Sequence, residues 1–366
     1  MTWQYSNPVR IIFTDAFHEK LGAVIGDKSD ILIVCSNRFR QTESFSRIKS
    51  ALPTAQCFTD IENNPSFDSC QRAIEFASSF EPKVIVAIGG GSVIDTAKAV
   101  RMAVYKSCYL IQELFQYAGE PLQKPLFIAV PTTHGSGSEM TMWATIWDKT
   151  DKVKHSLSEY SNYPDYALFD ASLVSSLPLS VSISSTLDAL SHSLEALWNK
   201  NSNPVSDHFA TEAIMLIMNS LDELAEPIPL EVRGNLLMAS MYAGLAFSNT
   251  KTAAAHSISY PLTAYFNIPH GIACSMSLYS LFKINRKQMQ HWPNLLQRIQ
   301  LNSFEELWGK VLDLVDTRVP FTLHEYSVAR DDLNWLTDMA FSKGRMENNI
   351  VDLSRDDVMK ILNDII

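Results

Sequence analysis

Short runs of apolar and β-branched residues alternate with longer amphipathic stretches through the first half of the chain. The most continuous runs are ILIVC at 31–35, KVIVAI at 83–88 and LFIAVP at 126–131, which are typical of parallel strands buried on both faces. The expected strands are residues 9–13, 31–35, 55–59, 83–88, 126–131 and 166–169, with a hairpin formed by 145–147 and 154–157. Helical spacing at 45–52 and 69–80 fills two of the intervals. This half therefore predicts an α/β fold with a parallel sheet.

The pattern changes near Pro178, where the strand-like runs stop and long helical patterns begin. The expected helices are residues 185–199, 205–225, 230–248, 252–264, 271–284 and 354–366. Prolines separate several of them, as expected of residues that interrupt helices. We therefore predict two domains, an α/β domain over 1–180 and an all-helical domain over 181–366.

Composition narrows the classes of protein. The chain has 366 residues, a 46% hydrophobic fraction and a formal net charge of −10, which favours a soluble globular protein over one that binds nucleic acid or an anionic membrane. Its five cysteines are scattered and include no C-x-x-C pair, so we expect reduced thiols and a cytoplasmic location. The N-terminus lacks a secretory-signal pattern, and no apolar run is long enough to span a bilayer.

A glycine-rich loop follows the strand at 83–88. Gly90, Gly91 and Ser92 lead directly into a helical pattern, and this arrangement lets backbone N–H groups at a helix start bind a phosphate. A tight strand-to-helix turn is the alternative. A second loop with Thr132 and Thr133 follows the strand at 126–131. Ligands bind at the carboxyl ends of such strands, so the two loops predict a dinucleotide site.

Four residues of the second half suit a metal ion. Asp188 and His192 are four apart in a helical pattern and so lie on one helix face. His256 and His270 follow later in the chain. One carboxylate and three imidazoles suit Fe(II) or Zn(II), with positions left for water or substrate. Taken singly, each histidine is more simply explained as an ordinary core or surface residue.

These blocks resemble the iron-containing (group III) alcohol dehydrogenase family. The matching segments are GGGSVIDTAK, PTTHGSGSEMT, LDALSHSLEALW and AAAHSISYPLTAYFNIPHG, which together span residues 83–285. The resemblance implies an N-terminal dinucleotide-binding α/β domain with a Rossmann-like parallel sheet and an all-helical metal- and substrate-binding domain. It also implies a nicotinamide held beside a divalent ion in the cleft between them. The metal ligands it implies are Asp188, His192, His256 and His270. The cofactor contacts it implies are Asn64, Gly90, Gly91, Ser92, Asp95, Thr132, Thr133 and Lys154.

One departure from the family pattern concerns the cofactor. Many NAD-preferring members have an Asp where this chain has Ser36. An Asp there repels the 2′-phosphate of NADP, whereas Ser36 does not, and Arg38 or Arg40 offers that phosphate a partner. We therefore favour NADP(H) or the use of both cofactors. The alternative is that both arginines are ordinary surface residues.

Further departures concern catalysis. Tyr260 stands where many members have a histidine proposed to relay a proton; it is a poor base at pH 7 but can donate a hydrogen bond. Lys251 replaces part of a glycine-rich stretch, and His134 replaces a common alanine. We predict catalytic roles for these three residues. Lys251 and His134, with Arg345 as a further candidate anchor, favour an anionic substrate.

The blocks NPVRIIF, LWNKNSNPVSD and SNTKTAAAHSISYPLT look most like the phosphonoacetaldehyde reductase (hydroxyethylphosphonate dehydrogenase) branch. That branch implies reduction of phosphonoacetaldehyde to 2-hydroxyethylphosphonate. The alternatives are a general short-chain alcohol, glycerol or maleylacetate-type dehydrogenase of the same fold, or a dinucleotide-binding sensor without turnover. The resemblance favours Fe(II), although Zn(II) binds such ligands more tightly. It also implies a homo-oligomer, which we expect to be a dimer.

Overall fold

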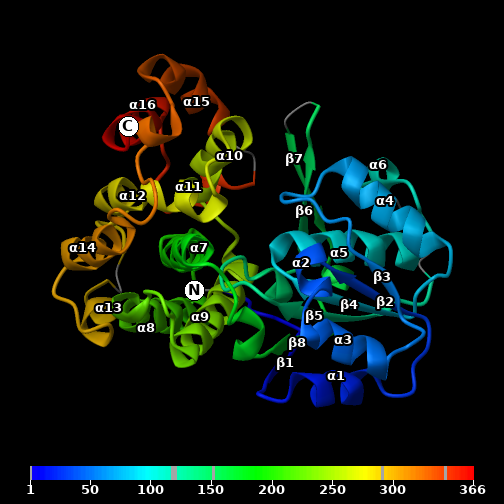
Figure 1. The fold of residues 1–366 in the computed structure, drawn as a ribbon. Coiled ribbons are helices and arrows are strands. Elements are labelled where there is room, and N and C mark those ends of the chain that lie inside the picture. Colours follow the sequence, from blue (N-terminus) through cyan, green and yellow to red (C-terminus); the bar gives the residue numbers. More distant parts are fainter. Residues whose placement is uncertain (1, 117–121, 151–152, 290–291, 342–343) are drawn as a thin grey trace. The chain divides into compact units, whose positions relative to one another are not determined.

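The computed structural model describes residues 2–116, 122–150, 153–289, 292–341 and 344–366, which fall into two compact units (Figure 1). The α/β unit comprises Asn7–Thr133 and Ser138–Val174. The helical unit comprises the residues up to Ser6, the loop His134–Gly137, and Ser175–Ile366. A short loop that follows a strand of the α/β unit therefore packs with the helices.

The α/β unit is built on a six-stranded sheet in which every strand pairing is parallel. In spatial order the strands are β1 (Arg10–Phe13), β8 (Tyr166–Phe169), β5 (Leu126–Pro131), β4 (Val84–Gly89), β2 (Ile31–Cys35) and β3 (Gln56–Phe58). The predicted α/β class with a Rossmann-like parallel sheet is confirmed. The separate hairpin of β6 (Trp143–Asp148) and β7 (Val153–Ser158) also forms, where the sequence predicts it.

Side chains alternate between the two faces of the sheet, and helices bury both faces (Figure 1). Leu32 and Val34 pack on one side, while Ile31 and Ile33 pack on the other. The first side is covered by α4 (Phe67–Ser78) and α5 (Gly91–Lys106), and the second by α1 (Phe17–Ile25) and α3 (Glu43–Ala51). Double burial is the physical reason that the central strands read as continuous apolar runs.

The chain changes direction within this sheet between β2 and β4. From β2 the chain moves outward to β3, and it then returns to place β4 on the other side of β2. Because the strands are parallel, the segments after β2, β4 and β5 leave the sheet at one edge. They begin with Ser36, Gly90 and Thr132. A ligand site at the carboxyl ends of strands that diverge in this way is the general rule for open α/β sheets.

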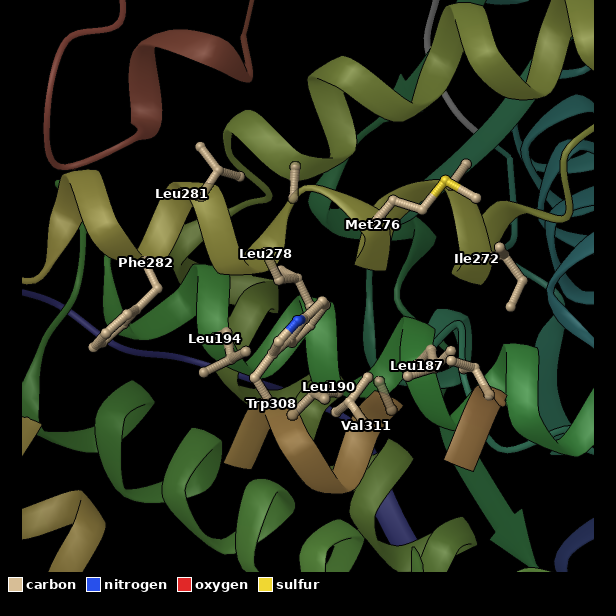
Figure 2. Close-up of a cluster of buried hydrophobic side chains, with 14 of the residues drawn as sticks. Leu187, Leu190, Leu194, Ile272, Met276, Leu278, Leu281, Phe282, Trp308 and Val311 are labelled. Atoms are coloured by element: carbon tan, nitrogen blue, oxygen red, sulfur yellow. The ribbon is translucent and has the colours of Figure 1, made fainter. Parts of the chain in front are cut away.

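The helical unit contains the remaining long helices. They are α7 (Leu179–Leu197), α8 (Pro204–Ser220), α9 (Leu230–Thr250), α10 (Ala254–Phe266), α11 (His270–Met276), α12 (Leu278–Asn285), α13 (Trp292–Arg298), α14 (Phe304–Val315), α15 (Leu333–Met339) and α16 (Arg355–Asp364). Figure 2 shows part of their shared core, to which α7, α11, α12 and α14 contribute apolar side chains. Within the described residues, no helix combines the length and apolar character needed to cross a membrane.

Several helix boundaries differ from expectation. The helix expected over 185–199 begins six residues earlier, at Leu179, and ends at Leu197. The predicted helix over 271–284 is divided into α11 and α12 at Ser277, whose hydroxyl bonds back to the carbonyl oxygen of Cys274. Such side-chain bonds compete with the regular backbone ladder. The predicted helix over 205–225 ends as an α-helix at Ser220 and continues as one 3₁₀ turn.

Candidate active site

The four expected metal ligands lie together within the helical unit. Asp188 and His192 share one face of α7, His256 lies in α10, and His270 begins α11. Asp188 Oδ1 is 3.8 Å from His192 Nδ1 and 3.6 Å from His256 Nε2. The ring centroids of His256 and His270 are 5.4 Å apart. Residues separated by more than 80 positions therefore present their polar atoms to one small volume.

The residues present fit a divalent ion. Asp188 Oδ1, His192 Nδ1 and His256 Nε2 are buried and have no hydrogen-bond partner among the described residues. Buried polar atoms left without a partner cost free energy. A cation bound beside these three atoms would accept a lone pair from each and so remove this cost.

Close packing of α11 on α7 brings the ligands together. A Cβ atom added at Gly271 would lie 1.9 Å from the carbonyl oxygen of Ser184 and 3.0 Å from Asp188 Cβ. Only glycine allows this approach, since any side chain would collide with the backbone of α7. The requirement is steric, and it places His270 next to Asp188.

A second carboxylate orients His256. Glu195 is fully buried and lies three residues after His192, on the same face of α7. It accepts a hydrogen bond from His256 Nδ1 at 2.5 Å. It also accepts one from the backbone N–H of His256 at 3.2 Å. Because Nδ1–H is used in this way, Nε2 keeps its lone pair for the ion. Sequence reasoning missed Glu195, although its spacing of three from His192 and seven from Asp188 places it on the same helix face.

The charges of these groups are strongly coupled. Burial opposes ionisation of Asp188, but His192 and the other imidazoles outweigh burial and lower the pKa of this carboxyl. Burial lowers the pKa of His192 to about 4, so its imidazole is neutral and competent as a ligand at pH 7. Burial likewise opposes a charge on His256, but nearby Cys274 and Glu195 raise its pKa. Two buried carboxylates among imidazoles make the site attractive to a cation.

Cys274 also lies in this cluster, and sequence reasoning missed it. Its Sγ is 3.7 Å from Nε2 and 3.8 Å from Nδ1 of His270, which is one helical turn earlier on α11. One ligand atom from each of Asp188, His256, His270 and Cys274 lies within 4.8 Å of the other three. Burial raises the pKa of the Cys274 thiol.

The expected phosphate loop lies in the α/β unit. Gly90 caps the N-terminus of α5, and a Cβ atom there would be 3.1 Å from the methyl group of Thr133. The backbone N–H of Asn64, which has a positive φ of 54°, donates to Ser92 Oγ at 3.2 Å. The loop after β4 thus brings together four of the predicted cofactor residues, and Gly91 is the first residue of α5.

Asp95 and Lys98 are parts of the framework beneath these loops. Asp95 accepts hydrogen bonds from the hydroxyl of Ser138 at 2.5 Å and from the N–H of Thr145 at 2.8 Å. Lys98 Nζ is fully buried and donates to Ser138 and to its neighbours in the same segment. The side chains of Asp95 and Lys98 therefore hold the segment after β5 in place through hydrogen bonds. Lys154 pairs with Trp147 in the hairpin, with its Nζ 5.9 Å from the indole centroid.

Comparison with known proteins agrees with this geometry. The model of the iron-containing alcohol dehydrogenases matches residues 8–171, and the model of the C-terminal part of the Fe-containing alcohol dehydrogenase family matches residues 182–366. The chain belongs to the iron-containing alcohol dehydrogenase family. It is accordingly an oxidoreductase of alcohols and aldehydes.

Individual relatives cover most of the chain. An NADPH-dependent butanol dehydrogenase of Clostridium saccharobutylicum is 30% identical over 86% of this chain and 84% of its own length. A 1,3-propanediol dehydrogenase of Klebsiella pneumoniae is 29% identical over 80% of this chain and 78% of its own. The structure of sulfoacetaldehyde reductase from Bifidobacterium kashiwanohense in complex with NAD+ superposes with a TM-score of 0.90 at 26% identity, over 100% of this chain and 99% of that one.

Tyr260, which stands where many family members have a histidine, lies beside the predicted metal ligand His270. Its ring is buried and stacks parallel to His270, with centroids 6.2 Å apart and an angle of 4° between the planes. The guanidinium of Arg345 lies over the Tyr260 ring, 4.9 Å from its centroid. The Tyr260 ring thus lies between the Arg345 guanidinium and the predicted ligand His270.

The other two predicted catalytic residues have different surroundings. Lys251 is the C-cap residue of α9 and has a positive φ of 66°. Its charge interacts with Glu347, which accepts hydrogen bonds from the N–H groups of Gly344 and Arg345. His134 is fully buried, and burial lowers its pKa to about 4. A neutral, enclosed imidazole is not a cationic anchor for an anion. Any role of His134 as a hydrogen-bond donor stays a prediction.

Proposed function

We propose that this chain is an NAD(P)H-dependent aldehyde reductase whose substrate carries a phosphonate or sulfonate group, with phosphonoacetaldehyde as the first candidate. The observation that carries the proposal is the row formed by Arg345, Tyr260 and His270. It sets a fixed positive charge one aromatic ring away from a metal ligand.

The chemistry follows from the donor set. When bound, a divalent ion supplies Lewis-acid polarisation of a carbonyl oxygen, and the reduced nicotinamide supplies hydride. Asp188, His192, His256 and His270 hold that ion. Glu195 keeps His256 in the required tautomer. Tyr260, with its phenol close to His270, is the candidate donor of the proton that the new alcohol requires.

An anionic tail would be bound by the cations near Tyr260. Arg345 presents a planar guanidinium, which pairs well with a phosphonate or sulfonate. Lys251 lies close enough to Glu347 for the two charges to interact, and the N–H groups of Gly344 and Arg345 bind the same carboxylate. The segment 344–347 thus links both cations. Similarity to a sulfoacetaldehyde reductase supports a small aldehyde with an anionic group.

For the cofactor we propose NADP(H), with NAD(H) also accepted. The hydroxyl of Ser36 caps α2 (Asn37–Arg40) by accepting from the N–H of Phe39, so the residue after β2 is neutral. Arg38 and Arg40 occupy the last turn of this short helix. The similar butanol dehydrogenase is NADPH-dependent, whereas the similar sulfoacetaldehyde reductase was crystallised with NAD+. Comparison of kcat/KM for NADPH and NADH tests the preference, and Ser36→Asp is expected to shift it toward NADH.

The deciding experiment is kcat/KM for phosphonoacetaldehyde, sulfoacetaldehyde, butyraldehyde and glyceraldehyde with each cofactor. We expect the two anionic aldehydes to exceed the neutral ones. Arg345→Ala should lower kcat/KM for the anionic aldehydes by about tenfold or more, because a hydrogen bond to a charged group contributes about 1.5–3 kcal/mol, and should leave butyraldehyde nearly unchanged. Arg330→Ala is the matched control, since Arg330 is an exposed arginine of the same unit. Equal rates for neutral and anionic aldehydes would remove the anionic-substrate proposal.

A further inference from the structure

Cys274 is placed like a ligand. It lies one helical turn after His270, so both side chains leave the same face of α11. Close packing at Gly271 presses that face onto α7 beside Asp188. The contacts of the thiol are polar: His270 lies within 3.8 Å, and His256 and Asp188 act on it electrostatically.

We propose that Cys274 binds the divalent ion through Sγ, as a fifth protein ligand beside the carboxylate and the three imidazoles. This inference rests on the metal-dependent function proposed above.

The dimensions of the cluster support direct ligation. Ligand atoms that bind one ion at about 2.0–2.3 Å can be no more than about 4.6 Å apart. Cys274 Sγ and one ligand atom from each of Asp188, His256 and His270 already lie within 4.8 Å of one another, so shifts of a few tenths of an ångström close these four around an ion.

A second, independent observation points to an ion at this position. Asp188 and His256 are more than nine-tenths buried, Asp188 Oδ1 lies 3.6 Å from His256 Nε2, and neither atom has a hydrogen-bond partner among the residues that the structure describes. The lone pairs of both atoms are therefore available to the ion that Cys274 would contact. On ligation the thiol loses its proton to solvent and binds as thiolate.

A thiolate changes which ion the site prefers. Sulfur is a soft ligand, and it favours Zn(II) and Co(II) over harder ions more than an all-nitrogen-and-oxygen set does. We therefore expect this chain to select zinc over ferrous iron more strongly than its three histidines and carboxylate alone would.

Cobalt spectroscopy tests the inference on the full-length chain. Metal-free protein is loaded with one equivalent of Co(II) without oxygen, and its near-ultraviolet absorption is recorded. A thiolate-to-cobalt charge-transfer band is expected in the wild type and in Cys70→Ser, and not in Cys274→Ser or Cys274→Ala. Cys70 is the matched control because it is a fully buried cysteine of the α/β unit. Chelator competition should show that both Cys274 variants lose Zn(II) affinity by about tenfold or more.

The outcomes separate this inference from the proposed function. Stoichiometric Co(II) binding without the band in the wild type overturns ligation by Cys274 and leaves metal-dependent reduction standing. A band that persists in Cys274→Ser also overturns it. Failure of the wild type to bind any divalent ion overturns both proposals. The wild-type spectrum decides the point even if a Cys274 variant does not fold.

Discussion

At the scale of single residues, the buried pair of Glu195 and His256 is the most informative contact. Glu195 is fully enclosed, and its two oxygens accept the ring and backbone N–H groups of His256. The burial cost of the carboxylate is offset by these bonds, since His256 lowers the pKa of Glu195 against the effect of burial. With Nδ1 bonded to Glu195, His256 Nε2 lies 3.6 Å from Asp188 Oδ1.

Glu195→Gln is expected to weaken metal binding by about 10–100-fold, because loss of an outer carboxylate frees the imidazole orientation and lowers its basicity. The measurement is chelator competition with Zn(II) or Co(II). Glu231→Gln, at an exposed position in the first turn of α9, serves as control. Unchanged affinity in Glu195→Gln would contradict a role in positioning His256.

The sequence predicted individual ligands better than their supporting residues. Asp188 and His192 were recognisable because helical periodicity is local. Glu195 and Cys274 follow the same periodicity, at three and four residues from predicted ligands, but a buried glutamate or cysteine is recognisable only once its partner from another helix is known.

At the scale of elements, the contact between α7 and α11 sets the dimensions of the site. The Gly271 contact at 1.9 Å involves backbone, which cannot move aside without shifting a helix. α14 contains a useful contrast, since a Cβ atom at Gly309 would meet nothing within 4 Å.

Gly271→Ala is expected to lower both the thermal midpoint and the Zn(II) affinity, because the added methyl group separates His270 from Asp188. Gly309→Ala should match or exceed wild-type stability, since alanine favours a helix by about 1 kcal/mol over glycine. Thermal unfolding and chelator competition check both. Wild-type metal affinity in Gly271→Ala would show that the close approach is not required.

The segment after β5 contains a buried acid that makes stability depend on pH. Burial raises the pKa of Glu139 from its ordinary 4.5 to about 7. Between these values the unfolded chain has released this proton and the folded chain has kept it, so the folded state loses stability as pH rises through this window. The loss at pH 8 is about 3.5 kcal/mol, from a shift of about 2.5 pKa units at about 1.4 kcal/mol per unit.

Glu139→Gln should therefore be more stable than the wild type at pH 8 and nearly equal to it at pH 4.5. Urea denaturation at the two pH values measures the difference. Glu113→Gln, at an exposed position of α6 (Ile111–Leu114), should show no such dependence. A pH-independent difference for Glu139→Gln would contradict the raised pKa.

At the scale of the whole molecule, the metal ligands join helices that are far apart in the chain. α7, α10 and α11 contribute Asp188, His192, His256 and His270 to one point of the helical unit. An ion bound there stabilises only the folded state, because the unfolded chain does not hold these groups together.

Removal of the metal with a chelator is expected to lower the thermal midpoint, and addition of Zn(II) or Fe(II) to restore it. At an ion concentration 100 times Kd the stabilisation is about 2.7 kcal/mol. Asp188→Asn should lose this response, while Asp331→Asn, at an exposed position, should keep it. A midpoint that does not respond to the ion in the wild type would refute the site.

The sequence by itself determined the strands, most of the helices and the residue types of the metal site, because apolar periodicity and helical spacing are properties of neighbouring residues. Only the tertiary structure decided that the loop His134–Gly137 packs with the helices, that Asp95 and Lys98 are framework groups, and that Glu195 and Cys274 accompany the ligands. These features depend on contacts between segments distant in the chain, and such contacts arise from packing that no local pattern encodes.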